Sequence, residues 1–110
     1  MLNKVRKQER YNYLLRDIVS SFIKQEIDFK AMVTVMRVET PDNLRSAEVF
    51  VSVFPEEKED EALHFFKRKK NDLYEFVKPR LKMRFLPSFS FEIDKAIKLE
   101  RKIEEISKNK

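Results

Sequence analysis

The chain has 110 residues, a length that suits one domain with a single core. It contains no cysteine, which excludes disulfides and thiolate metal sites, and no glycine, which excludes glycine-rich phosphate loops and dinucleotide fingerprints. No apolar run approaches the roughly 20 residues that a membrane span needs, and the polar N-terminus is unlike a signal peptide. We therefore expect a soluble cytoplasmic protein.

Charge is unevenly distributed along the chain. Residues 62–84 carry 8 Lys/Arg and 2 Asp/Glu, a net +6, whereas residues 31–61 carry 3 Lys/Arg and 8 Asp/Glu, a net −5. The whole chain is only +5. One short segment therefore holds more than the entire net charge, which predicts contact with a polyanion, with nucleic acid as the first candidate.

The first predicted element is a long amphipathic helix over residues 4–26. Its apolar positions recur every three or four residues and form one stripe: Tyr11, Leu14, Leu15, Ile18, Val19, Phe22 and Ile23. The first turns are basic, although a helix dipole favours acidic residues there. A frayed, solvated end and a contact with phosphate both explain this basic start, and the sequence leaves the two open.

Two β-branched, alternating segments at 31–39 and 46–54 predict a β-hairpin, with its turn at 40–43. In the second strand four apolar residues share one face: Ala47, Val49, Val51 and Val53. In a chain without glycine, any residue with positive φ is expected to be Asn or Asp. This singles out Asn43 and Asn71.

A helix is predicted to begin at Pro55, with acidic residues over 56–61 and basic residues over 67–70. Both ends match the helix dipole, so helix stabilisation is an alternative explanation for the basic cluster. Asn71 follows as the expected left-handed residue of a helix kink. A second helix of about two turns then ends or kinks near Pro79.

Residues 82–93 predict the third strand, in which Pro87 implies a sheet edge or a bulge. A charged helix over 95–107 follows, and residues 108–110 are expected to be a disordered tail. The chain thus reads as one domain over 1–107 with the order α-β-β-α(kink)α-β-α. A hairpin and a right-handed helical crossover predict a three-stranded mixed sheet with helices packed on one face.

This element order is that of a type II KH domain, an α+β fold, and the sequence resembles the ribosome-binding factor A family over about residues 4–106. The resemblance rests on QEI (25–27), VTVMRVE (33–39), AEVFVSVF (47–54), the acidic-to-basic helix, and KMRFLPSFSFEID (82–94). The family's Ala-x-Gly kink falls on residues 69–71, where this chain has Lys-Lys-Asn. It also departs from the family in a short connection at 28–30 and in Pro79.

The resemblance implies a bacterial, non-enzymatic assembly factor that binds the immature 30S subunit and assists 5′-end processing of 16S rRNA and subunit maturation. Members of the family are associated with growth in the cold. We also expect that the protein binds no cofactor, metal, small-molecule substrate or membrane, and that it is a monomer when free. Two other functions stay open. One is a protein-interaction module that docks a partner on its exposed sheet or acidic helix face; the other is a general KH-type RNA-binding protein outside the ribosome.

Candidate rRNA contacts are basic because Lys and Arg neutralise phosphates. The main candidates are Lys67, Arg68, Lys70, Lys78, Arg80, Lys82 and Arg84, and the secondary ones are Lys4, Arg6, Lys7 and Arg10. Four phenylalanines could stack on bases, although we expect them in the core or against the sheet: Phe50, Phe54, Phe85 and Phe89. His64, the single histidine, has no second histidine or cysteine to complete a metal site, and the acidic run at 56–61 is typical of a solvated helix start.

Overall fold

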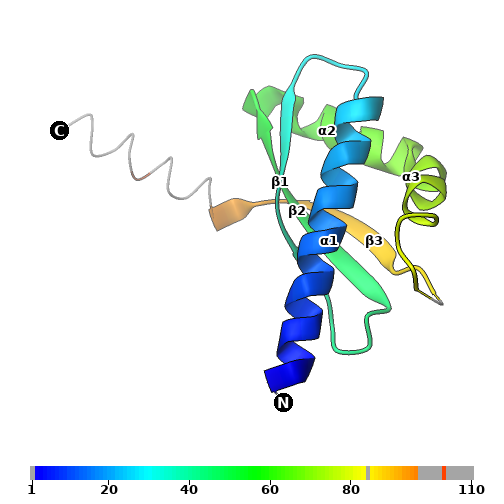
Figure 1. Cartoon of the computed structure of the whole chain (residues 1–110). Coiled ribbons are helices and arrows are strands. Elements are labelled where there is room, and N and C mark those ends of the chain that lie inside the picture. Colours follow the sequence, from blue (N-terminus) through cyan, green and yellow to red (C-terminus); the bar gives the residue numbers. More distant parts are fainter. Residues whose placement is uncertain (1, 84, 97–102, 104–110) are drawn as a thin grey trace.

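The computed structural model describes residues 2–83, 85–96 and 103. Its elements are, in chain order, α1 (Leu2–Glu26), β1 (Met32–Glu39), β2 (Ser46–Phe54), the 3-10 helix η1 (Glu56–Lys58), α2 (Glu59–Arg68), α3 (Lys70–Val77) and β3 (Ser88–Ile93) (Figure 1). The predicted order and the α+β, KH-like class are confirmed as far as β3. Lys95, Ala96 and Ile103 are helical, and the rest of the predicted helix 95–107 and the predicted tail 108–110 lie outside the described residues.

The three strands form a mixed sheet in the order β1-β2-β3. β1 and β2 pair antiparallel, with a register shift between Val35 and Arg37, and β2 and β3 pair parallel. Alternate residues of β2 are buried, which confirms the predicted inward face: Ala47, Val49, Val51 and Val53. The predicted mixed sheet therefore forms because apolar side chains recur with the period of two that one buried face requires.

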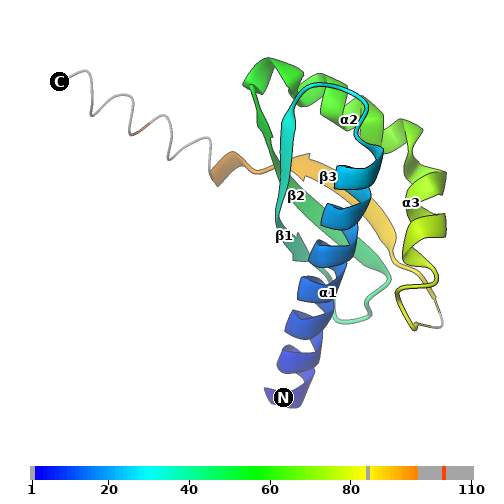
Figure 2. The ribbon, with the colours of Figure 1, turned by 45° about the horizontal axis from the view of Figure 1, so that its top comes forward.

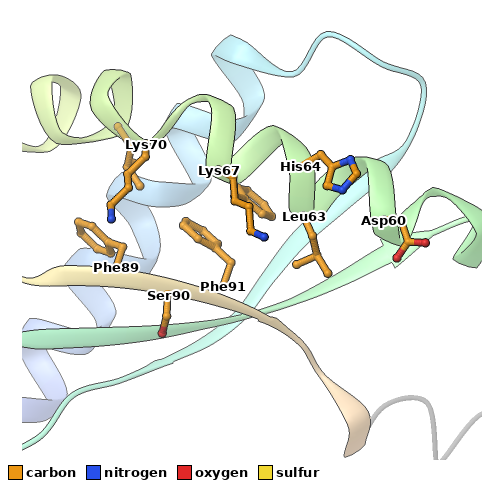
Figure 3. Close-up of a pocket in the computed structure, with 10 residues that line it drawn as sticks. Asp60, Leu63, His64, Lys67, Lys70, Phe89, Ser90 and Phe91 are labelled. Atoms are coloured by element: carbon orange, nitrogen blue, oxygen red, sulfur yellow. The ribbon is translucent and has the colours of Figure 1, made fainter.

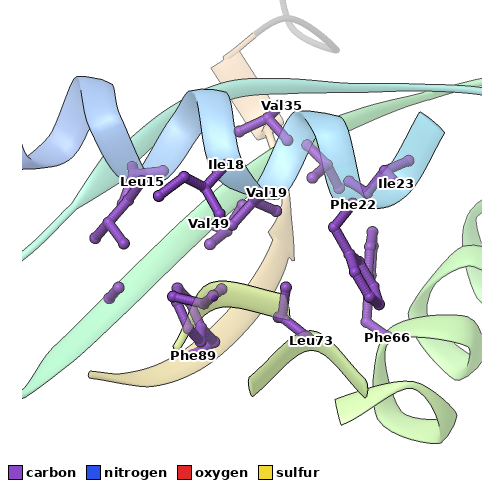
Figure 4. Close-up of a cluster of buried hydrophobic side chains, with 14 of the residues drawn as sticks. Leu15, Ile18, Val19, Phe22, Ile23, Val35, Val49, Phe66, Leu73 and Phe89 are labelled. Carbon is purple, nitrogen blue, oxygen red and sulfur yellow. The ribbon is translucent and has the colours of Figure 1, made fainter. Parts of the chain in front are cut away.

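The helices cover this inward face. Figure 2 shows α1 lying across the strands, with α2 and α3 forming a bent pair beside it. One cluster of buried side chains joins the helices to the sheet (Figure 4). It contains Leu15, Val19 and Phe22 of α1, Val49 of β2, Phe66 of α2, Leu73 of α3 and Phe89 of β3. The apolar stripe predicted for α1 is thus the side that packs against the sheet.

The helix break between α2 and α3 falls at Lys69, so the prediction for Asn71 is wrong. Lys69 has φ −96° and ψ 13°, in the bridge region that ordinary residues can adopt, and Asn71 lies within α3. The amide of Lys69 donates to Phe65 O and the amide of Leu73 donates to Lys69 O, both at 2.9 Å. Because these helix-type hydrogen bonds continue on both sides, the bend needs no left-handed residue.

Positive φ occurs instead at Leu44, with φ 56°, in the hairpin turn. Asn43 closes this turn with its side chain, since its Oδ1 accepts a hydrogen bond of 3.0 Å from the amide of Arg45. The expectation that Asn43 itself would take the left-handed conformation is wrong, because its amide oxygen serves as the acceptor of an Asx-type turn.

The third strand begins at Ser88, six residues later than predicted. Of the residues predicted to extend it, 82, 83 and 85–87 are irregular. Pro87 is fully buried directly before the strand, and β3 lies at the sheet edge, as the proline indicated. Phe89 is buried, Phe91 and Ile93 are half-buried, and Ser90 and Glu92 between them are exposed, so burial alternates along the strand.

Candidate RNA-binding groove

An open groove of about 440 Å³ runs between the α2–α3 bend and the edge strand β3. Leu63, His64 and Lys67 line it from α2, and Phe89, Ser90 and Phe91 line it from β3 (Figure 3). The remaining lining residues are Asp60, Phe66, Lys70 and Leu73. The groove thus brings together side chains from two segments about 25 residues apart, which the local sequence pattern does not predict.

Aromatic rings form the floor of the groove and hold it in shape. Phe66 of α2 stacks parallel on Phe91 of β3, with ring centroids 3.9 Å apart and an interplanar angle of 6°. Tyr74 of α3 packs against Phe89 at 5.7 Å, and its hydroxyl accepts a hydrogen bond of 3.3 Å from the Phe89 amide. These contacts fix the strand edge relative to both helices.

The backbone of β3 presents hydrogen-bonding groups to the groove. The amides of Ser88 and Asp94 donate to Arg45 O and Val51 O, on the β2 side, at 2.9 and 2.8 Å. Since backbone groups alternate in direction along a strand, those of Phe89 and Phe91 point away from β2. The Phe89 amide already bonds Tyr74, which leaves the Phe89 carbonyl and the Phe91 amide and carbonyl as the edge groups that a ligand in the groove can bond.

Lys67 and Lys70 place positive charge at this groove. They are three residues apart on the bent pair of helices, and both are exposed. Figure 3 shows their side chains extending toward Phe91 and Phe89. The groove therefore combines cations for phosphates, aromatic surface for bases and a free strand edge. Proteins bind single-stranded nucleic acids through features of this kind.

Arg68, another of the candidate rRNA contacts, points away from the groove. Its guanidinium lies 3.0 Å from the carboxylate of Asp28, in the connection that follows α1. Lys69 also turns that way, 3.8 Å from Glu26. Because successive residues on a helix point about 100° apart, one basic run cannot present all its charges to one groove.

The other predicted rRNA contacts are spread further along the chain. Arg80 follows α3, where it donates a 2.7 Å hydrogen bond to Phe76 O and lies 3.6 Å from the centre of the Phe76 ring. Lys78, Lys82, Lys7 and Arg10 are exposed, whereas Arg84 and the side chains of Lys4 and Arg6 lie outside the described residues. The structure therefore brings only Lys67 and Lys70 of the predicted set, among the described side chains, into the groove.

The phenylalanines considered for stacking have different environments. Phe89 is buried, and Phe50 is half-buried beneath Arg37, whose guanidinium carbon lies 4.0 Å from the ring centre. Phe54 and Phe85 are 63% and 75% exposed, so the expectation that they are core or sheet-packing residues is wrong. Phe54 falls on the outward face of β2, and Phe85 in the loop before β3, where the alternating pattern no longer implies burial.

The described residues contain no group of His, Cys, Asp and Glu side chains that could hold a metal ion. Within the same residues, no helix is both long enough and apolar enough to cross a membrane.

The fold and the groove define a KH-like α+β domain. Residues 7–107 match the family model of ribosome-binding factor A. The chain is 33% identical to ribosome-binding factor A of Caldanaerobacter subterraneus over 106 residues, which cover 93% of this chain and 87% of that protein. It is 37% identical to that of Bdellovibrio bacteriovorus over 76 residues, 68% of this chain and 57% of that protein. The chain belongs to the ribosome-binding factor A family.

Solved structures show the same likeness. The crystal structure of ribosome-binding factor A from Thermus thermophilus aligns with a TM-score of 0.73 over 81% of this chain and 97% of that one, at 24% identity, which shows the shared fold. A homology model of the Thermus thermophilus protein, as fitted into a cryo-EM map of a 30S–RbfA complex, aligns with a TM-score of 0.65 at 26% identity, over 74% of this chain and 89% of that one.

Proposed function

We propose that this protein binds the immature 30S subunit, contacts 16S rRNA, and assists 5′-end processing and subunit maturation without catalysing a reaction. The observation that carries the proposal is the pair Lys67 and Lys70 at an aromatic-floored groove, in a member of this family. The fitting of a Thermus thermophilus relative into a 30S complex supports the choice of partner. The protein acts in the cytoplasm, and we expect its loss to slow growth in the cold.

In this proposal, an unpaired stretch of rRNA lies along β3. Its bases contact the half-buried ring of Phe91, and its phosphates contact Lys67 and Lys70. The remaining predicted contacts would extend the footprint along the loop and α1, through Lys78, Arg80, Lys82, Arg84, Lys4, Arg6, Lys7 and Arg10. Arg68 contributes only if it leaves Asp28.

The double variant Lys67→Glu/Lys70→Glu tests the proposal. Two attractions to phosphate become repulsions, so we expect association with 30S precursors to fall at least tenfold, about 1.4 kcal/mol. The slope of the salt dependence of the remaining binding should also fall by roughly 1.4–1.8, at about 0.7–0.9 for each of the two lost contacts. Sucrose-gradient sedimentation with precursors, at several KCl concentrations, measures both quantities.

Lys24→Glu/Lys30→Glu is the control of equal charge change. Both lysines are exposed, at the end of α1 and in the connection to β1, away from the groove. We expect this variant to bind within about twofold of the unmodified protein, since 0.4 kcal/mol is about a factor of two. Equal losses in the two double variants would show that only net charge matters and would contradict a localised site. Co-sedimentation with polysomes instead of free subunits would contradict the assembly role.

A further inference from the structure

The sheet has an outward face that none of the described helices covers. Strand pairing places Met32 beside Phe54, Thr34 beside Ser52, Arg37 beside Phe50 and Glu39 beside Glu48. Across β2, Glu92 lies beside Phe50 and Ser90 beside Glu48. This outer face is defined here by these residues of β1, β2 and β3, and its chemistry is opposite to that of the groove.

One end of the outer face is apolar. Met32 and Phe54 are neighbours across the strands, and they are 68% and 63% exposed. Phe54 is the last residue of β2, and the exposed carboxylates Glu56 and Glu57 of η1 follow it directly. Adjacent exposed apolar side chains beside charged groups are typical of a protein contact surface.

The other end is acidic and carries an unfavourable pair. Glu39 and Glu48 lie directly opposite each other on neighbouring strands, an arrangement in which like charges destabilise a sheet. Arg37 relieves part of this, because its guanidinium lies 3.0 Å from Glu39. The guanidinium also lies 2.9 Å from Asp94. The pKa of Arg37 is raised, mainly by the hydrogen bond to Glu39 and further by Asp94, although partial desolvation acts in the opposite direction. The one guanidinium among the described outer-face residues is thus already held by two carboxylates.

We infer that the outer face docks a basic, amphipathic segment of a protein in the assembling particle. Lysine or arginine side chains of that segment would sit between Glu39, Glu48 and Glu92, and an apolar side chain would cover Met32 and Phe54. From Glu48 to Phe54 the face is roughly 20 Å long at about 3.3 Å per residue, enough for a helical segment of about 13 residues. RNA is unsuited to this face because its phosphates would meet the carboxylates.

This inference rests on the proposed function, because the proposed function names the 30S precursor as the particle that holds the partner. The observations behind it come from the outer face and not from the groove. The two sides can therefore be tested separately by photo-crosslinking from Phe54→p-benzoylphenylalanine and Lys67→p-benzoylphenylalanine, each bound to 30S precursors. We expect position 54 to form a nuclease-resistant crosslink to a protein, at a peptide rich in Lys and Arg. Position 67 should form a nuclease-sensitive crosslink to rRNA.

Three results at position 54 would overturn the inference while co-sedimentation persists. They are a crosslink to rRNA, a crosslink to residues 97–110 of the same chain, and no crosslink at all. Absence of co-sedimentation would remove the proposed function and this inference with it. A normal position-67 crosslink combined with a failed position-54 crosslink would remove this inference alone.

A second variant pair tests the apolar end without the crosslinker. Met32→Ser/Phe54→Ser changes two exposed side chains, so the fold should persist, and we expect the protein crosslink from position 34 (Thr34→p-benzoylphenylalanine), beside Ser52 on the outer face, to weaken at least fivefold. Leu14→Ser, at an exposed position of α1, is the matched control and should leave that crosslink unchanged. Equal crosslink yields in all three backgrounds would contradict docking at Met32 and Phe54.

Discussion

The groove at the edge of β3 and the outer face are different surfaces of one small sheet that share Ser90, and they differ in both charge and construction. Lys67 and Lys70 meet packed aromatic rings in the groove, whereas the outer face presents Glu39 and Glu48 beside exposed apolar side chains. Two cations of the basic segment 62–84 thus face the groove, and two carboxylates of the acidic segment 31–61 face the outer side of the sheet. A net charge of +5 hides a charge separation that can orient the domain on a mixed RNA and protein surface.

The largest expected difference between the two sides concerns stability. Phe66 is buried and stacks on Phe91, so Phe66→Ala should lower the free energy of unfolding by about 3–5 kcal/mol. Phe54→Ala on the outer face should change it by no more than about 0.5 kcal/mol, because Phe54 is exposed. Urea denaturation of both variants measures this contrast. A large loss for Phe54→Ala would show that something covers the outer face in the free protein.

A smaller effect tests the like-charge pair on the outer face. Glu48→Gln removes one of two opposed carboxylates, so we expect a gain of about 0.2–1 kcal/mol in the free energy of unfolding at low salt. Glu92→Gln is the matched control, since Glu92 faces Phe50 across the strands. The gain should shrink as salt screens the repulsion. Equal gains for both variants would mean that total acidity, and not the pair, limits stability.

The sequence predicted the inward face of β2 and the stripe of α1 because burial imposes a strict period on apolar residues. It did not predict the groove, since Phe66 and Phe91 meet only after the crossover has folded back onto the sheet. The direction of Arg68 was also beyond the sequence, because it depends on Asp28, a partner 40 residues away. Charge counts along a segment therefore indicate a basic surface, but they do not show which cations lie together on it.

Local backbone conformation was the least predictable feature, and Asn71 shows why. The absence of glycine suggested that an asparagine must make the kink, yet Lys69 makes it within the bridge region. Leu44 adopts positive φ in the turn although leucine is disfavoured there. Residue preferences rank the candidates for such positions, but the geometry that the packed helices and strands require decides whether a left-handed residue is needed.

The smallest expected effect therefore concerns Asn71, in the first turn of α3. Since Asn71 is exposed and helical, and Asn and Val have similar helix propensities, Asn71→Val should change the free energy of unfolding by at most about 0.5 kcal/mol. Leu44→Val is the comparison, because a β-branched residue at φ 56° should cost more than about 1 kcal/mol. Thermal melts of both variants distinguish the two positions. A loss above 1 kcal/mol for Asn71→Val would instead place the left-handed residue at Asn71, and the lysines at the groove would then be held by a sharper kink than the one at Lys69.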